Sequence, residues 1–255
     1  KMNRKLFSVL LFSFSLGIGS AKAQNFARKV NTLIGTDYTG NTYPGAQAPF
    51  GMVQLSPDNG LPGWDRIAGY FYPDSTIAGF SHTHLSGTGA GDLYDISYLP
   101  ATKPFSIGEE PLGLHSKFSH KDETAYAGYY QVRLQDYDIN VELTATPRCG
   151  VQRYTFPKNG KERYVVLNLA KAMNWDATKN SAITLVDSFT IEGYRFSDGW
   201  ARGQRVWFRT RFSQPIKSIE IEKTPISSDA NGCVAYLTFD ADGPEQLVLC
   251  NRRDR

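Results

Sequence analysis

The feature that most restricts what this sequence can fold into is an alternation of apolar and polar residues that begins near Tyr129. The clearest examples are the apolar positions Tyr130-Val132-Leu134 and Ile139-Val141-Leu143. Successive side chains of an extended strand point to opposite faces, so a period of two predicts strands that bury one face and expose the other. This part of the chain is therefore expected to form a half-buried β-sheet.

Short apolar runs separated by turn signals continue the pattern along the rest of the chain. The runs are residues 154–156, 164–169, 183–186, 206–208 and 246–249. The turn signals are Pro157-Lys158-Asn159-Gly160, Ser197-Asp198-Gly199 and Ala241-Asp242-Gly243. Many short strands at this spacing, with few helical stretches, favour an all-β fold, an antiparallel sandwich or barrel. Residues 31–100 are rich in Gly, Pro, Asp and aromatic side chains and are predicted to form long loops, where binding residues tend to lie.

Residues 1–23 have the pattern of a secretory signal peptide. A basic start is followed by the apolar run Leu6–Ile18 and by an A-x-A site at Ala21-Lys22-Ala23. The run is shorter than the ~20 residues that a membrane-spanning helix needs. We therefore predict cleavage after Ala23, a mature chain that is exported to the periplasm or secreted, and no membrane span after cleavage.

Removing this segment changes the charge balance of the chain. The sequence has 28 Lys and Arg against 25 Asp and Glu. Four of the basic residues lie in the signal peptide, namely Lys1, Arg4, Lys5 and Lys22. The mature chain therefore keeps 24 Lys and Arg. A nearly neutral chain lacks the basic surface on which nucleic-acid binding depends, so no nucleic acid partner is expected.

The three cysteines are widely spaced and include no C-x-x-C pair; they are Cys149, Cys233 and Cys250. This pattern excludes a disulfide framework and a zinc knuckle. A single bridge in an oxidising compartment and free thiols both stay open.

The segment Gly79–Asp92, GFSHTHLSGTGAGD, is the densest group of polar, chemistry-bearing residues. His82 and His84 would share one face of an extended backbone, but a zinc site needs further ligands for which no positions stand out, so no metal ligand is nominated. The glycines do not follow the G-x-G-x-x-G or Walker patterns, and no βαβ unit surrounds them. Neither serine has the flanking glycines of a hydrolase nucleophile elbow.

The remaining interpretation is a glycine-rich loop that offers imidazole, hydroxyl and backbone N–H groups to a hydroxyl-rich ligand. Trp64, Asp65 and Arg66 lie upstream. An aromatic face beside charged groups is typical of sugar binding, because the ring covers C–H groups while the charges bridge hydroxyls. The alternative is that Trp64 packs in a loop cluster and Asp65 caps a turn.

Several long segments, in order along the mature chain, resemble glycoside hydrolase family 92. They are Val30–Gly60, Ala68–Pro100, Ala127–Leu134, Glu142–Pro157 and Gly199–Ser213. The resemblance implies calcium-dependent exo-acting α-mannosidases of bacteria, in which an N-terminal β-sandwich packs against a larger (α/α)6 helical domain. It implies hydrolysis with inversion, in which carboxyls about 6.5–9.5 Å apart admit the attacking water.

The resemblance also limits what this chain is expected to do. In the family the catalytic acid, the base and most calcium ligands come from the helical domain, which this sequence lacks, so it is interpreted as truncated. We predict a signal peptide at 1–23 and the family 92 N-terminal sandwich at 24–255, with no catalytic residue and no bound calcium of its own. The candidate substrate-binding residues are Trp64, Asp65, His82, His84, Asp37 and Asp92. For Asp37 and Asp92 a turn or cap hydrogen bond is the alternative.

Three functions stay open. The leading hypothesis is the N-terminal domain of an exported α-mannosidase, of the α-1,2 exo type, that shapes the pocket for mannose-containing glycans and is inactive without its helical partner domain. The second is a stand-alone carbohydrate-binding module. The third is an interaction scaffold whose exposed face docks the helical domain.

Overall fold

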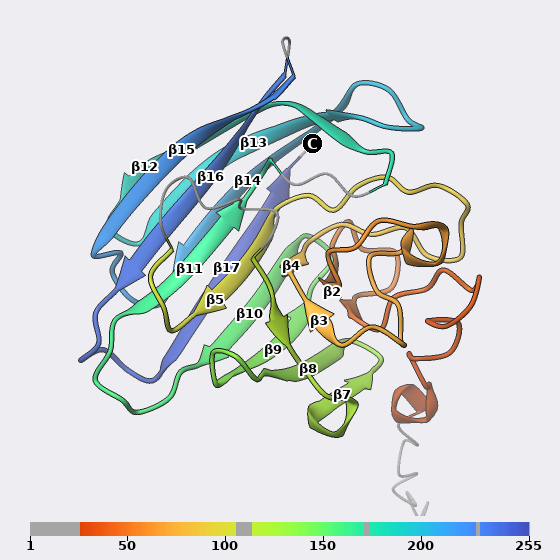
Figure 1. Ribbon diagram of the computed structural model, residues 1–255, viewed down its shortest axis with the longest axis horizontal. Helices are drawn as coiled ribbons and strands as arrows, with labels where there is room; N and C mark the ends of the chain where they lie inside the picture. The colour runs from red at the N-terminus through yellow and green to blue at the C-terminus, as the bar shows by residue number, and fades with distance from the viewer. Residues whose placement is uncertain (1–25, 106–113, 171–173, 228–229, 255) are drawn as a thin grey trace, which may run out of the picture.

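The protein is described by a computed structural model that covers residues 26–105, 114–170, 174–227 and 230–254. Strands make up nearly all of its regular structure (Figure 1). Three single helical turns accompany them, at Phe26–Lys29 (η1), Trp64–Arg66 (η2) and His120–Asp122 (η3). The all-β prediction is confirmed, while the predicted signal peptide lies outside the described residues.

The strands of the first half are short. They are β1 (Ala46–Gln47), β2 (Gln54–Asp58), β3 (Thr76–Ile77), β4 (Gly79–Ser81), β5 (Ser97–Ala101), β6 (Ser116–Lys117) and β7 (Glu123–Tyr126). Those of the second half are longer. They are β8 (Tyr129–Leu134), β9 (Ile139–Ala145), β10 (Cys149–Thr155), β11 (Arg163–Asn168), β12 (Ala177–Asp187), β13 (Thr190–Asp198), β14 (Gln204–Phe212), β15 (Ser218–Ser227), β16 (Ala230–Phe239) and β17 (Gln246–Asp254).

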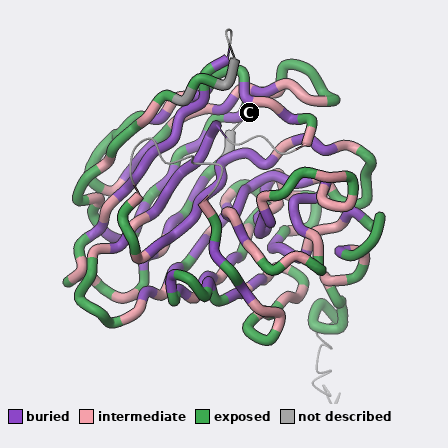
Figure 2. The backbone as a smooth tube through the Cα atoms, in the orientation of Figure 1, coloured by how far each residue is buried: buried purple, intermediate pink, exposed green. Residues whose placement is uncertain are grey.

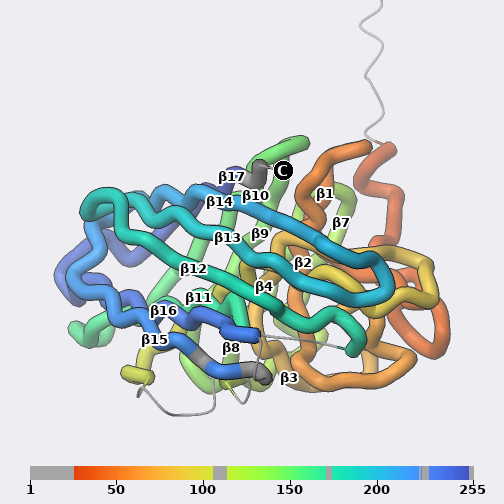
Figure 3. Tube along the Cα trace, turned by 90° about the horizontal axis from the view of Figure 1, so that it is seen from above, coloured from red at the N-terminus to blue at the C-terminus, as the bar shows by residue number. Residues whose placement is uncertain are grey.

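Fifteen strands form one hydrogen-bonded sheet, and β3 and β6 form a separate pair. The order is β1-β2-β4-β5-β11-β16-β12-β13-β14-β17-β10-β9-β8-β7, with β15 on β16. The sheet curls until β1 and β2 contact β9, so its two ends approach each other (Figure 3). Among the described strands, the antiparallel prediction holds for every pair but the single parallel contact Asn180↔Asn231 of β12 and β16. The two separate sheets of a sandwich are not observed, because β17 pairs with both β14 and β10 and joins the layers.

The predicted alternation appears directly in the burial of the strands. The apolar positions of β8 and β9 are buried while their neighbours are partly or fully exposed, and β14 alternates along its length. The inward side chains of these strands belong to one apolar core cluster. Figure 2 shows buried positions running along neighbouring strands.

β16 departs from the alternation, since nearly all of its residues are buried. One side of this strand contributes Ala235 and Leu237 to the main core. On the other side Val234 and Tyr236 form a second apolar cluster that is covered by Phe105. A strand covered on both faces has no polar face to alternate with.

Candidate functional site

The Gly-rich segment Gly79–Asp92 begins with β4 and continues into the loop that leads to β5, and its two histidines turn into the protein. The ring of His82 is fully buried, with Nδ1 2.9 Å from the carbonyl oxygen of Ile96, and packs edge-on against Tyr98. Its neighbour His84 is buried as well. Both rings therefore support the loop from behind, and the predicted contact of His82 and His84 with a sugar stays a prediction that this placement does not favour.

His84 is the centre of a buried polar cluster. Its Nδ1 is 2.7 Å from the carbonyl oxygen of Gln54, and its Nε2 is 2.9 Å from Asp58 Oδ1 and 3.1 Å from Ser81 Oγ. Oxygen atoms therefore lie within hydrogen-bond distance of both ring nitrogens. The serine and the carboxylate share one nitrogen, whereas a catalytic triad places them on opposite nitrogens.

Asp92 anchors a turn that is distant in sequence. Its buried carboxylate accepts hydrogen bonds from the backbone N–H groups of Trp200 and Ala201, both at 2.8 Å, and from Gln204 Nε2 at 3.2 Å. A Cβ atom on Gly199 would lie 2.3 Å from Asp92 Oδ1, so the close approach requires glycine. The turn between β13 and β14 is thereby fixed to the Gly-rich segment.

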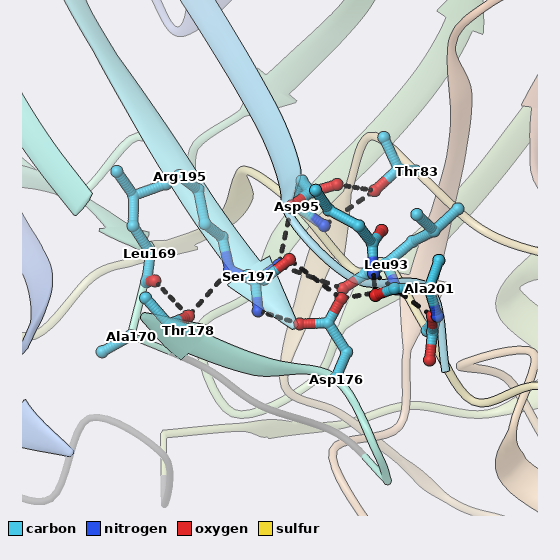
Figure 4. A network of polar contacts seen from close by, with 12 residues as sticks. Thr83, Leu93, Asp95, Leu169, Ala170, Asp176, Thr178, Arg195, Ser197 and Ala201 are labelled. Atoms are coloured by element: carbon cyan, nitrogen blue, oxygen red, sulfur yellow. Dashed lines mark hydrogen bonds and ion pairs between the residues drawn. The ribbon is translucent and has the colours of Figure 1, made fainter. Parts of the chain in front are cut away.

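A buried ion cluster also fixes the loop that follows β4 (Figure 4). Arg195 on β13 contacts Asp95 at 2.7 Å and Asp176 at 2.5 Å, and all three side chains are almost completely buried. The other oxygens of these carboxylates accept hydrogen bonds from Thr83 Oγ1 at 2.8 Å and from the Leu93 N–H at 2.9 Å. Burial raises the pKa of Asp176, and the Arg195 charge opposes that rise. The cluster joins both ends of the loop to β12 and β13.

Three exposed tryptophans surround this anchored loop, and we refer to Trp64, Trp175 and Trp200 as the tryptophan rim. Their exposed fractions are 54%, 47% and 80%. The rings of Trp64 and Trp175 lie 6.1 Å apart. A Cβ atom on Gly89 would be 3.3 Å from the Trp64 ring, which places the Gly-rich loop against the rim. The rim therefore gathers residues from three distant parts of the sequence.

Asn174 couples two members of the rim. Its Oδ1 accepts a hydrogen bond of 2.9 Å from the N–H of Gly63, which immediately precedes Trp64. Asn174 also precedes Trp175, whose N–H donates to the Gly91 carbonyl oxygen at 3.3 Å. A Cβ atom on Gly91 would lie 2.6 Å from Asn174 Cβ, so glycine is required there. The two indoles are thus positioned by one side chain and one glycine.

Two hollows open beside Trp200. One, of about 410 Å³, is lined by Trp175, Ala177, Lys179, Asp198, Gly199, Trp200 and Arg202. The other, of about 620 Å³, is lined by Leu85, Thr88, Gly89, Ala90, Asp92, Leu93, Trp200, Ala201 and Gln204. Indole faces beside hydroxyl, amide and charged groups suit a ligand that has an apolar face and a hydroxyl-bearing edge, such as a pyranose ring.

The remaining predicted residues are placed differently. Asp65 is half-buried in η2 beside Trp64. The pKa of Arg66 is raised, mainly by its hydrogen bond with Asp74 and also by the negative charge of Asp65. Asp37 is exposed in a separate turn, where its carboxylate accepts the Tyr38 N–H at 2.7 Å. The structure therefore places Trp64, Asp65 and Asp92 at the loop and the rim. It gives both Asp37 and Asp92 the turn hydrogen bonds that were the alternative for these two aspartates.

Trp175 and Trp200 were not nominated from the sequence. Two signals were available: Trp175 is followed by aspartate, as Trp64 is, and Trp200 directly follows the turn signal Ser197-Asp198-Gly199. Neither signal reports that the two side chains lie beside Trp64.

Within the described residues, no group of three or more His, Cys, Asp or Glu side chains is arranged to hold a metal ion.

No described helix combines the length and the apolar character needed to cross a membrane.

Comparison with known proteins agrees on one relationship. Residues 29–249 match the glycosyl hydrolase family 92 N-terminal domain. A family GH92 α-mannosidase from Bacteroides thetaiotaomicron, solved with mannoimidazole, is 31% identical with a TM-score of 0.79 over 90% of this chain and 32% of its own. A family GH92 inverting mannosidase from the same organism is 26% identical with a TM-score of 0.74 over 92% of this chain and 32% of its own.

A protein of Arthroderma benhamiae, described as an uncharacterized secreted glycosidase, is 29% identical over 236 residues. The match covers 76% of this chain and 28% of that protein. The chain thus spans about a third of the length of these relatives.

Proposed function

Because the chain belongs to glycoside hydrolase family 92, whose N-terminal domain it matches over residues 29–249, we propose that it is the sugar-receiving part of an exported α-mannosidase. Its ligands are mannose-containing glycans, and its tryptophan rim forms one wall of the site that receives them. The relatives that are mannosidases and the relative described as secreted support this assignment.

The observation that carries the proposal is the tryptophan rim itself. Exposed indoles are costly to leave in water, yet Trp64, Trp175 and Trp200 converge on one loop that is tied down by buried ion pairs. Rigid aromatic side chains lose little conformational entropy on binding, and a fixed loop preserves that advantage. The rim is therefore suited to stacking against the apolar face of a sugar.

The chemistry of hydrolysis is assigned to the rest of the longer family enzyme. The buried carboxylates around the loop are already committed: Asp92 to the Trp200 turn, and Asp95 and Asp176 to Arg195. The proposed reaction removes terminal α-1,2-linked mannose with inversion, using an acid, a base and calcium held outside the described residues, in the (α/α)6 domain. The part played by this chain is to hold and orient the sugar.

The binding proposal is tested by affinity electrophoresis of residues 24–255 in gels that contain α-mannan. We expect the chain to be retarded by α-mannan but not by dextran, and Trp64→Ala, Trp175→Ala and Trp200→Ala each to reduce the retardation by about tenfold in apparent affinity, as the loss of ~1–1.5 kcal/mol of aromatic contact implies. Trp207→Ala is the matched control, since Trp207 is exposed on β14 and lines neither hollow.

Equal retardation by α-mannan and dextran, or loss of binding in the Trp207 variant alone, would contradict the role of the rim.

A stand-alone binding module is the second candidate, favoured by the high exposure of the rim in this chain. The two functions separate in a hydrolysis assay with an aryl α-mannoside and calcium. For the chain alone we expect turnover no higher than in a buffer blank. Turnover that disappears when one of its own carboxylates is replaced would place catalytic groups in this chain and overturn the division of labour proposed above.

A further inference from the structure

Two of the three cysteines lie on neighbouring strands. β10 and β17 pair antiparallel, with Val151 opposite Cys250 and Cys149 opposite Arg252. Cys149 and Cys250 are therefore diagonal neighbours across the strand pair. All three cysteines are free thiols in this structure.

The two thiols also share a face of the sheet. On β10 the residues that alternate with Cys149, Gly150 and Gln152, are buried, and on β17 the flanking Leu249 and Asn251 are buried. Cys149 is half-buried and Cys250 is exposed. Both side chains therefore leave the sheet on its outer face, within reach of a solution reagent.

The two side chains interact with each other. Burial raises the pKa of Cys250, and the Cys149 thiol raises it further through its charge and a hydrogen bond. Cys233 differs: it is buried on β16, and its thiol contacts the carbonyl oxygen of Ser181 at 3.1 Å.

We propose that Cys149 and Cys250 are a redox pair that closes into an intrachain disulfide between β10 and β17 when the chain meets a small-molecule disulfide as oxidant. The bond is independent of what the tryptophan rim binds, and Cys233 takes no part in it.

The reaction is thiol–disulfide exchange in two steps. The thiolate of one cysteine, Cys250 being the more exposed, attacks a sulfur of the small disulfide; a mixed disulfide forms and one small thiolate leaves. The thiolate of Cys149 then attacks the Cys250 sulfur and expels the second small thiolate. Two protein thiols lose two protons and two electrons, one S–S bond forms, and the small disulfide is reduced to two thiols.

The position of the pair determines what the bond would do. Diagonal neighbours in a sheet lie about 7–8 Å apart, slightly more than the ~7 Å between Cα atoms that a disulfide bridges without backbone movement, so closure requires a small shift of β17 relative to β10. The bond would enclose about 100 residues, including β11 to β16. Since β17 also pairs with β14, the crosslink would secure the strand that joins two parts of the sheet.

The test uses residues 24–255 incubated with oxidised glutathione, followed by alkylation of free thiols and peptide mapping without reduction. We expect a crosslinked peptide pair that contains Cys149 and Cys250, and an alkylated Cys233 exposed on unfolding. The melting temperature should rise by about 5–10 °C on oxidation and return on reduction. Cys233→Ser should keep this shift, and Cys149→Ser and Cys250→Ser should each abolish it.

Three results would overturn the proposal: two unresolved glutathione adducts at Cys149 and Cys250, a bond that includes Cys233, or full alkylation of Cys149 and Cys250 after oxidation. The oxidation shift is compared within each variant, so a lower starting stability does not obscure the outcome.

Discussion

At the scale of single residues, the buried carboxylates of the Gly-rich segment act as connectors. Asp92 receives two backbone N–H groups from the β13–β14 turn, and Arg195 lies between Asp95 and Asp176. Buried polar groups are tolerated when their hydrogen bonds are satisfied, and they then fix the geometry of what they join. The tryptophan rim inherits its position from these contacts.

Asp92→Ala tests the first connector. Removing the carboxylate leaves the N–H groups of Trp200 and Ala201 without their acceptor, and we expect a loss of about 1–3 kcal/mol in the free energy of unfolding. Urea denaturation measures this loss, and retardation by α-mannan should fall in parallel. Asp37→Ala, an exposed turn residue, should change stability by no more than about 0.5 kcal/mol. An equal effect of the two substitutions would argue against an anchoring role.

Arg195→Met tests the ion cluster. The substitution leaves Asp95 and Asp176 buried without their cation, and breaking such a buried pair typically costs about 3–5 kcal/mol. Arg209→Met is the matched control, because its ion pair with Glu192 is largely exposed and should contribute at most about 1 kcal/mol. Chemical denaturation measures the free energy of unfolding of both variants. A similar, small loss in the two variants would show that the ion cluster contributes little to stability.

The candidate site was only partly predictable from residue types. The polar, Gly-rich composition singled out the segment that lies against the tryptophan rim, and Trp64 is exposed beside it. Composition does not report which way a side chain points, so His82 and His84 could not be recognised as interior residues. Trp175 and Trp200 join the site through contacts that span about a hundred residues, and no local pattern encodes such contacts.

At the scale of elements, a cross-strand ion pair between β9 and β10 makes stability depend on pH. Glu142 and Arg153 are direct partners in the register, and the guanidinium binds the carboxylate through two nitrogens. The hydrogen bond from Arg153 is the largest of the effects that together lower the pKa of Glu142 below its ordinary value of 4.5.

The sign of the pH dependence follows from that shift. A carboxyl with a lowered pKa in the folded state contributes stability above its unfolded pKa and loses that contribution as the pH falls through the folded value. Arg153→Met should therefore reduce stability near pH 7 and have less effect below about pH 4. Because the Arg153 side chain is 44% exposed, the difference should be at most about 1 kcal/mol.

Urea unfolding of both proteins across this pH range checks the expectation. The more exposed pair Arg133–Asp138 supplies the control, and Arg133→Met should show a smaller effect. A larger effect of Arg153→Met at low pH than at neutral pH would contradict the expected direction of the pH dependence.

Strands with one exposed face were the clearest in the sequence, although the largely buried β11 was also identified as an apolar run. β8, β9 and β14 alternate and were identified. β16 is covered on both sides, so its sequence has no period and it was not identified. Strand pairing was beyond local pattern altogether, since the partners of β17 lie far back in the sequence.

At the scale of the whole molecule, β17 is the strand on which the continuity of the sheet depends. It lies between β14 and β10, and its loss would leave both with unpaired edges and uncover the core around Leu247 and Leu249.

A chain that ends at Glu245 should therefore fail to unfold cooperatively and should associate with itself. Circular dichroism during urea titration, together with light scattering, measures both properties. Removal of η1, residues 26–29, is the control, because none of its residues is buried and the remaining chain should keep a cooperative transition. Cooperative unfolding of the chain without β17 would show that the two parts of the sheet are independently stable.

The position of β17 also has a consequence in time. β17 is the last of the described strands to be synthesised, and β10 and β14, the strands it must join, are made well before it. Pairing between segments so distant in sequence is slow, because the entropy cost of closing a long loop must be met before the stabilising contacts form. Until β17 is synthesised, β10 and β14 of the nascent chain each have one unpaired edge. Aggregation is therefore most favoured just before β17 emerges, and a chaperone would protect the chain most at that stage.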